Sequence, residues 1–205
     1  MTLRSALAAA TAAATLLIVA TPASAQQFSD SYQFLEAVRK GDGTKVTSLI
    51  TDTNGSIVNT KDRATGEGAL HIIARKGETV YLRFLLQKGA NPNLQDSEGN
   101  TPMMVAVGAS YIEGVQVLIV YKGNVNLPNS RGETPLIRAV QLRNTEMVRE
   151  LLKAGADPDR TDNIAGMSAR DYAKADRRSP TIQKLLADAP KLGARTEAET
   201  AGPNL

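Results

Sequence analysis

The stretch from Gln95 to Leu127, QDSEGNTPMMVAVGASYIEGVQVLIVYKGNVNL, specifies the fold, because the segments on either side of it are related to it. Its opening run GNTP at 99–102 corresponds to GETP at 132–135, which lies 33 residues further along the chain. Its closing turn has counterparts at the same spacing, so that similar turns occur at 89–93, 122–126 and 155–159. Self-similarity at a period of this size indicates a solenoid, in which small units bury their apolar faces against neighbouring units.

Each unit carries local signals for two short helices. In Thr101-Pro102 and Thr134-Pro135 the threonine can cap free amides, and proline at the first helical position loses no helix hydrogen bond. A second helix is predicted over 147–152, where the apolar residues fall on one helical face. Gly89 and Gly155 follow these second helices and supply the left-handed residue that ends them. The sequence therefore predicts an all-α fold.

These runs resemble the units of the ankyrin repeat family, which read glycine-any-threonine-proline-leucine-histidine, then two helices, then a glycine-alanine-aspartate turn. The resemblance is strong for 132–136 with 151–159, and for 70–74 with 85–93. It covers residues 28–189 and implies an ankyrin-repeat solenoid of about five helix-turn-helix units, with irregular capping units at both ends. The expected domain, 26–189, divides into units at about 28–62, 63–95, 96–128, 129–161 and 162–189.

Three places depart from the regular unit. The loop at 51–63 is three residues longer than the regular spacing, and Gly68-Ala69 replace threonine-proline, which weakens that helix start. Lys122 stands where the turn glycine belongs. A left-handed backbone there would cost about 1–2 kcal/mol, so we expect either a shift of the turn onto Gly123 or a feature that compensates for the strain.

The N-terminus carries the pattern of a secretory signal peptide, predicted over residues 1–25. Arg4 supplies the positive start, Ala6–Ala20 form an uncharged run, and Ala23-Ser24-Ala25 provide a cleavage site of small residues. The alternative is a retained membrane anchor. The run is, however, shorter than the roughly 20 apolar residues that a membrane-spanning helix needs, which favours cleavage.

Export agrees with the absence of cysteine from the whole sequence, which also rules out lipidation at a cleavage-site cysteine. We expect a bacterial periplasmic or secreted protein, monomeric, with no stable membrane insertion after cleavage of the signal peptide. Residues 190–205 contain few large apolar side chains and are predicted to form a disordered tail.

Composition and motifs argue against several functional classes. The net charge is only +3 and tryptophan is absent, so nucleic acid is not an expected partner. His71 is the single histidine and no cysteine exists to complete a zinc set or a catalytic dyad. In the family resemblance His71 is a structural residue that hydrogen-bonds neighbouring loops. The acidic cluster at 157–162 does not have the spacing of a calcium loop. We therefore expect no enzymatic activity, no cofactor and no metal.

The resemblance also implies where a protein partner would bind, because ankyrin proteins use the concave face of their first helices and the tips of their turns. Carried over residue by residue, the ends of the first helices and the tips give the candidate partner-binding set Arg39, Lys40, Arg75, Lys76, Glu98, Asn100, Arg131, Glu133, Gln141 and Leu142. The four basic residues would make the N-terminal half of the concave face basic. The alternative is that these are ordinary solvated charges.

The function that follows from the sequence is a non-enzymatic protein–protein interaction module exported to the periplasm. An alternative is an accessory or protective factor for an exported enzyme, since some bacterial periplasmic ankyrin proteins are associated with oxidative-stress defence. A hydrolase with an unrecognised site is a third hypothesis, although no sequence motif supports it.

Overall fold

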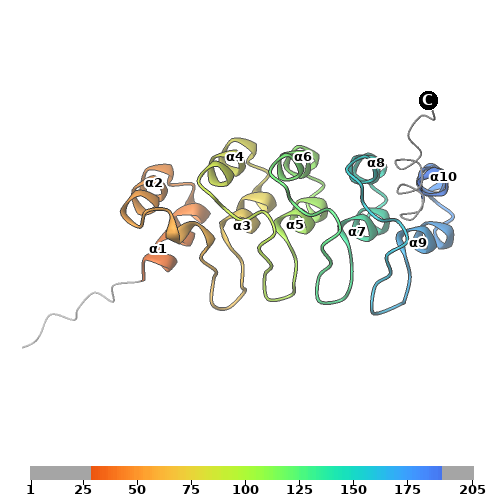
Figure 1. Cartoon of the computed structure of the whole chain (residues 1–205), viewed down its shortest axis with the longest axis horizontal. Helices are drawn as coiled ribbons and strands as arrows, with labels where there is room; N and C mark the ends of the chain where they lie inside the picture. Colours follow the sequence, from red (N-terminus) through yellow and green to blue (C-terminus); the bar gives the residue numbers. More distant parts are fainter. Residues whose placement is uncertain (1–28, 191–205) are drawn as a thin grey trace, which may run out of the picture.

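The computed structural model describes residues 29–190, and within this range the chain forms ten α-helices and one short 3₁₀ helix, η1 (Ser56–Asn59) (Figure 1). The α-helices form five consecutive pairs, so the predicted all-α repeat solenoid is confirmed. The pairs are α1 (Asp30–Lys40) with α2 (Gly43–Asp52), α3 (Ala69–Lys76) with α4 (Thr79–Gln87), α5 (Pro102–Gly108) with α6 (Ile112–Val120), α7 (Pro135–Gln141) with α8 (Thr145–Lys153), and α9 (Ala169–Ala175) with α10 (Pro180–Asp188).

Each predicted unit contains one of these pairs. The predicted signal peptide at 1–25 and all but the first residue of the predicted tail at 190–205 lie outside the described residues. The longer loop at 51–63 contains η1.

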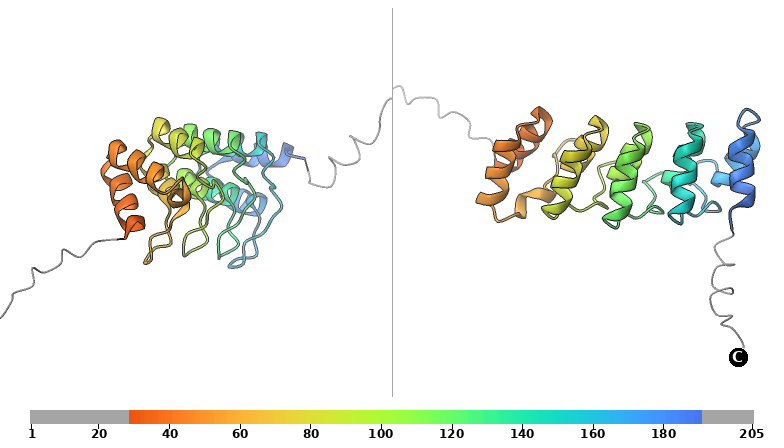
Figure 2. Two further views of the ribbon diagram at one scale, coloured as in Figure 1. Left: turned by 60° about the vertical axis from the view of Figure 1, so that its left-hand side comes forward. Right: turned by 90° about the horizontal axis from the view of Figure 1, so that it is seen from above.

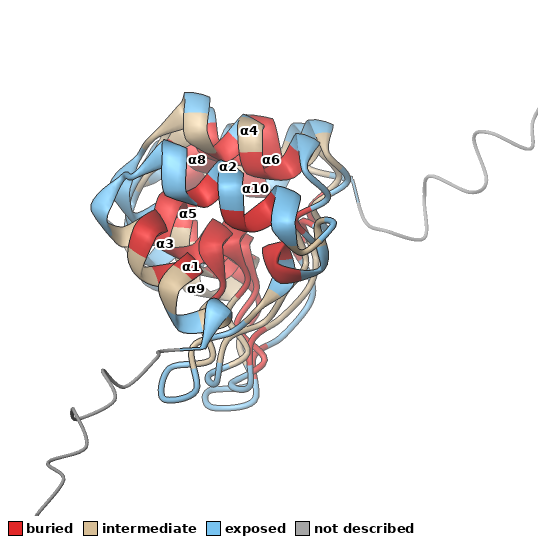
Figure 3. Cartoon of the chain, turned by 90° about the vertical axis from the view of Figure 1, so that its left-hand side faces the viewer, coloured by how far each residue is buried: buried red, intermediate tan, exposed pale blue. Residues whose placement is uncertain are grey.

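The helices form two parallel rows (Figures 1 and 2). The first helices of the units, α1, α3, α5, α7 and α9, pack side by side in one row, while α4, α6, α8 and α10 pack side by side in the other. The core runs between the rows as a continuous apolar layer (Figure 3). Leu85, Leu118 and Leu151 contribute to it at the 33-residue period, and all three are 0% exposed. Each unit therefore completes the core of the next.

The first helices begin as the threonine-proline signals predict. Thr101 accepts a hydrogen bond from the backbone N–H of Met104, and Thr134 accepts one from Ile137, both at 3.3 Å. Gly68 has no side chain with which to cap α3. Instead its own backbone N–H donates to Nδ1 of His71 at 3.1 Å, so the histidine satisfies one of the free amides at this helix start.

Four long loops project beside the first helices, and we call their tips, residues 62–67, 96–100, 129–133 and 162–167, the fingers (Figure 1). Consecutive fingers are joined by backbone hydrogen bonds, and we call this series of bonds the finger ladder. The N–H of Ser97 donates to the carbonyl of Thr65 at 3.0 Å, and Ser130 donates to Glu98 at 2.9 Å. The N–H of Asn163 completes the series by donating to Arg131 at 2.8 Å.

Glycine at the finger tips makes this approach possible. Gly99 has φ +79°, a region that other residues rarely adopt, and a Cβ atom there would lie 2.6 Å from the backbone nitrogen of Ser130. Gly66 and Gly132 occupy the same position in the neighbouring fingers, with φ of +71° and +75°. The glycine that opens each repeat in the sequence therefore serves the contact between fingers.

A second ladder runs through the turns that follow the second helices. The side-chain amide of Asn93 donates to the carbonyl of Lys122 at 3.3 Å and accepts from the N–H of Asn124 at 2.7 Å. Asn59 and Asn126 make the same pair of bonds to the units that follow them. The two ladders fix the spacing of the units on both sides of the core.

Lys122 retains the left-handed conformation, with φ 65°, where Gly89 and Gly155 have 88° and 89°. The turn does not shift onto Gly123, so that alternative is wrong. Gly123 has a different role, since a Cβ atom there would lie 2.8 Å from the carbonyl oxygen of Leu118.

Replacement of Lys122 by glycine should raise the free energy of unfolding by about 1 kcal/mol, because glycine adopts this conformation without the cost that Lys122 bears. Chemical denaturation of the two proteins measures the difference. Lys88→Gly is the matched control, because Lys88 ends the neighbouring helix at φ −83°, where glycine offers no relief and should destabilise. Equal effects of the two substitutions would contradict strain at Lys122.

His71 connects α3 to the next finger. Its ring is fully buried, and Nε2 lies 3.0 Å from the carbonyl oxygen of Asn100 while Nδ1 accepts from Gly68. These partners require the neutral tautomer with hydrogen on Nε2. Burial is the main reason that the pKa of His71 lies below its ordinary value. The predicted structural role of His71 is confirmed.

The lowered pKa of His71 links stability to pH. Because the unfolded chain binds this proton more readily than the folded one, the stabilisation is fully present above about pH 6.5 and is lost as pH falls below that value. The free energy of unfolding should therefore decline as the pH falls below about 6.5, and His71→Gln should flatten that decline. The carboxyl groups with lowered pKa, such as Asp62, titrate at lower pH. An unchanged slope in the variant would contradict the linkage.

Candidate functional site

A small hollow of about 360 Å³ lies on the concave face, where the row of first helices meets the fingers. Helix α5 forms its floor through Met104, Val105, Gly108 and Ala109. Gly108 and Ala109 are exposed and carry almost no side chain, so a partner can approach the backbone closely there. The floor is therefore shallow, apolar and accessible.

Three arginines line this hollow, and they come from two units that lie on either side of the unit of α5. Arg75 reaches it from α3, Arg131 from the finger at 129–133, and Arg138 from α7. Their side chains are 58%, 55% and 42% exposed. Glu98 is the one acidic residue among the lining residues. We call this feature the arginine hollow.

Carboxylates inside the fingers hold two of the arginines in place. Arg131 and Arg138 lie 3.2 and 3.7 Å from the two carboxylate oxygens of Glu133, which is itself 6% exposed and also accepts from Asn129 at 3.1 Å. Glu133 thus has little surface to offer a partner. It is a buried anchor that leaves one side of each guanidinium free to form further hydrogen bonds.

The third arginine is anchored by the preceding finger. Arg75 donates to the carboxylate of Glu67, and this bond is the main reason that the pKa of Arg75 lies above its ordinary value. Arg39 contacts the same finger, with a 2.6 Å bond to Asp62. That guanidinium, together with backbone N–H groups, lowers the pKa of Asp62 to about 2. The backbone N–H of Asp62 donates to the carbonyl of Glu67 at 2.8 Å, so Arg39 and Arg75 are paired with carboxylates on opposite sides of one finger.

The two predicted lysines are paired as well. Lys40 lies 3.2 Å from Glu36, and Lys76 lies 3.1 Å from Glu78. Each of the four basic residues predicted at the ends of the first helices, Arg39, Lys40, Arg75 and Lys76, is therefore paired with a carboxylate. We call these four residues the basic strip. Such pairs at an exposed surface leave the region nearly neutral, so the strip by itself is a weaker attractor for anions than its sequence indicates.

The remaining candidates occupy different settings. Glu98 is exposed, whereas Asn100 is half-buried and bonded to Asp96 and Glu98 within its own finger. Gln141 and Leu142 are exposed at the end of α7. No structural feature tests whether they bind a partner.

Arg138 was not among the residues expected from the sequence. The family rule selects the last residues of each first helix, and Arg138 stands three residues before the end of α7. The repeat alignment offers a signal, because Arg138 lies 33 residues after Val105, which forms part of the floor of the hollow. The change from an apolar residue, Val105, to a charged one, Arg138, at the same repeat position could have indicated this site.

The acidic residues near 157–162 serve internal contacts. Asp159 accepts from Arg170 at 2.7 Å, and Asp162 is buried, accepting from Tyr172 and from three backbone amides of its own finger. Between residues 29 and 190, no group of three or more metal-ligating side chains comes together. In the same range, no helix has the length and apolar character required to cross a membrane.

Comparison with known proteins places this geometry in a family. A family model for ankyrin repeats in three copies matches residues 34–129, 82–162 and 112–196. The chain is 36% identical over 130 residues to neurogenic locus notch homolog protein 1 of Danio rerio, covering 62% of this chain. It is 40% identical over 60 residues, or 29% of its length, to the nuclear factor NF-kappa-B p110 subunit of Drosophila melanogaster.

These relatives are far larger proteins, since the matched regions cover 5% and 6% of their respective lengths. The likeness is therefore confined to the repeat array. The family match extends over most of the chain, and it agrees with the paired helices, the finger ladder and the threonine-proline caps. The chain belongs to the ankyrin repeat family.

Proposed function

We propose that this protein is a non-enzymatic interaction module that binds an acidic segment of a partner protein in the arginine hollow. As an ankyrin-repeat array, the chain has the architecture of a protein–protein interaction module. The observation that supports the more specific proposal is the convergence of Arg75, Arg131 and Arg138 on one shallow floor.

The chemistry of the hollow fits a carboxylate. Guanidinium groups present donors in a planar fork that matches the two oxygens of Asp or Glu, and such charge-assisted bonds are stronger than neutral ones. Because Glu133 and Glu67 already orient the arginines, little side-chain entropy is lost when a partner binds. The small residues at 108–109 allow the partner's backbone to approach α5.

The charges outside the hollow would act mainly on the rate of association. Arg39, Lys40 and Lys76 are each offset by a neighbouring carboxylate, and exposed pairs of this kind contribute little to affinity. Interfacial charges can nevertheless steer an oppositely charged partner during encounter. We therefore propose that the arginine hollow provides most of the affinity, and that the charges around it increase the rate of association.

We also propose that the protein is exported, to the bacterial periplasm or beyond. The support for this lies in the charged start, apolar run and small-residue site at 1–25. A repeat array without cysteine is suited to an oxidising compartment, because it has no thiol to form incorrect disulfides.

The export proposal is tested by the mass of the mature protein. When the full-length gene product is expressed in a bacterium and the periplasmic fraction is isolated, its intact mass should correspond to a chain that begins at Gln26. Replacement of Ala23 and Ala25 by large residues should block this processing, because signal peptidase sites need small residues there. Recovery of the chain with residues 1–25 retained would refute cleavage.

The binding proposal is tested with a partner captured from the same compartment and purified. The double substitution Arg75→Gln with Arg131→Gln should weaken its affinity about a hundredfold or more, because each of the two lost charge-assisted bonds is worth about 1.5–3 kcal/mol. Association should also slow as salt is added.

Two matched double variants serve as controls for that experiment. Arg83→Gln with Arg149→Gln removes two exposed arginines from the outer helices α4 and α8 and should leave affinity unchanged. Lys40→Gln with Lys76→Gln should have only a small effect. If the hollow variant keeps the affinity of the parent at low salt while its helical spectrum is intact, the partner binds elsewhere.

A further inference from the structure

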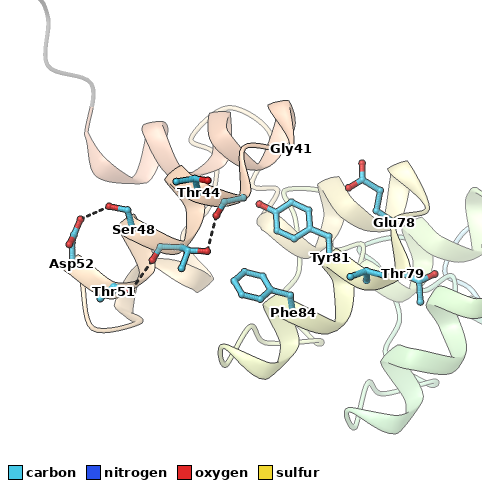
Figure 4. Close-up of a pocket in the computed structure, with 12 residues that line it drawn as sticks. Gly41, Thr44, Ser48, Thr51, Asp52, Glu78, Thr79, Tyr81 and Phe84 are labelled. Carbon is cyan, nitrogen blue, oxygen red and sulfur yellow. Dashed lines mark hydrogen bonds between the residues drawn. The ribbon is translucent and has the colours of Figure 1, made fainter.

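A second recessed surface lies in the other row of helices, on the side of the array away from the fingers. It is a groove of about 1420 Å³ between α2 and α4 (Figure 4). The outer helices α4, α6, α8 and α10 pack against one another in succession, but α2 makes less contact with α4 than any of these pairs. The groove is the gap that results.

The repeat period shows what this gap leaves uncovered. Tyr81 and Phe84 project from α4 toward α2 and are only partly buried. The residue 66 positions after Tyr81 is Met147, which is 0% exposed, and the residue 33 positions after Phe84 is Val117, which is 2% exposed. The first interface in the outer row is thus left partly open.

An exposed valine extends this apolar surface. Val80 is 84% exposed, although the equivalent positions in the next two units carry Glu113 and Glu146. The sequence therefore places an apolar side chain on α4 where α6 and α8 have an exposed carboxylate. Together with Tyr81 and Phe84 it gives α4 an apolar wall that faces the groove.

The wall contributed by α2 is less polar than its composition indicates. The hydroxyl of Thr47 donates to the carbonyl of Gly43 at 2.7 Å, and that of Thr51 donates to the carbonyl of Thr47 at 2.9 Å. Ser48 donates to Asp52 at 3.0 Å. Because these hydroxyls are satisfied within α2, the threonines can offer their methyl groups to the groove (Figure 4).

The polar groups that remain in the groove define the chemistry of an occupant. Asp52 and Glu78 line it, Glu78 being paired with Lys76, and none of the lining residues is basic. The hydroxyl oxygen of Tyr81 is buried and has no hydrogen-bond partner within residues 29–190. Because this oxygen has no accessible surface, the charge preference of the groove comes from Asp52 and Glu78.

We propose that this groove binds an amphipathic helix of a partner protein, with apolar side chains against Val80 and Phe84 and lysine or arginine directed at Asp52 and Glu78. The walls are themselves two helices, and a third helix can pack between them by the usual interlocking of side chains. Helices α2 and α4 have 10 and 9 residues, so the groove between them is about 13–15 Å long, which is the length of between two and three helical turns.

This surface is separate from the arginine hollow. The hollow opens on the first helices and the fingers, whereas the groove lies between second helices and involves none of the three arginines. It also selects the opposite charge. One array would therefore bind an acidic segment on its concave face and a basic amphipathic helix on its outer row.

Two designed peptides of about 15 residues provide the probe for this proposal. Both are amphipathic helices with leucine on one face, and they carry lysine or glutamate on the other. Fluorescence anisotropy with the complete processed chain should show the leucine–lysine peptide binding at least tenfold more tightly than the leucine–glutamate peptide. Equal binding of the two peptides would overturn the proposed charge preference.

Substitutions then locate the peptide. Val80→Lys should weaken binding of the leucine–lysine peptide about tenfold, whereas Val120→Lys adds the same charge to an exposed valine on α6 and should leave binding unchanged. Tyr81→Phe should leave binding unchanged and should not lower the denaturation midpoint, because the hydroxyl that it removes is buried and has no partner within residues 29–190. Undiminished binding by Val80→Lys, with the fold intact by circular dichroism, would overturn the proposal.

Two further measurements separate the alternatives. The variant with Arg75→Gln and Arg131→Gln should bind the leucine–lysine peptide like the parent. The proposal for the groove can therefore be refuted without refuting the proposal for the arginine hollow, and the reverse also holds. Sedimentation of the chain alone should show one copy per particle. A concentration-dependent dimer that Val80→Lys dissociates would identify a second copy of this chain as the occupant and overturn the proposal.

Discussion

The structure depends on the contact between consecutive units, because a pair of helices of this length can bury its apolar side chains only against the next pair. Leu85, Leu118 and Leu151 are fully buried through that stacking. The ladders at the fingers and at Asn59, Asn93 and Asn126 add hydrogen bonds that run from one unit to the next. Apolar packing thus provides the stabilisation, and the directional bonds fix the distance and twist between units.

The candidate site follows from this spacing. Arg75, Arg131 and Arg138 are far apart in the sequence, and no single unit could bring them together. They converge because neighbouring fingers are held at hydrogen-bond distance and because Glu67 and Glu133 orient the guanidinium groups. The groove between α2 and α4 shows the opposite case. Where the outer helices do not close, aromatic side chains that would otherwise be covered face solvent.

The sequence predicted the repeat period, the helix pairs, the threonine-proline caps and the structural role of His71, because each depends on residues close together in the chain or on the repeat itself. It could not show that Arg39 and Arg75 contact opposite sides of one finger, nor that Glu133 is buried, since ion pairing is decided by side chains from different loops. Arg138 was missed for the same reason. The open interface beside Tyr81 depends on how closely two helices approach, which periodicity does not specify.

The finger ladder divides two tasks between different atoms of the same residues. Glu98 and Arg131 give their backbone carbonyls to the neighbouring finger, while their side chains line the arginine hollow. The hydrogen bonds that join the units at these positions involve only backbone atoms, so they do not depend on which side chain is present. Mutation can alter the surface that a partner meets without a matching change in the scaffold, so the fingers can diversify in recognition while the architecture of the array is inherited intact.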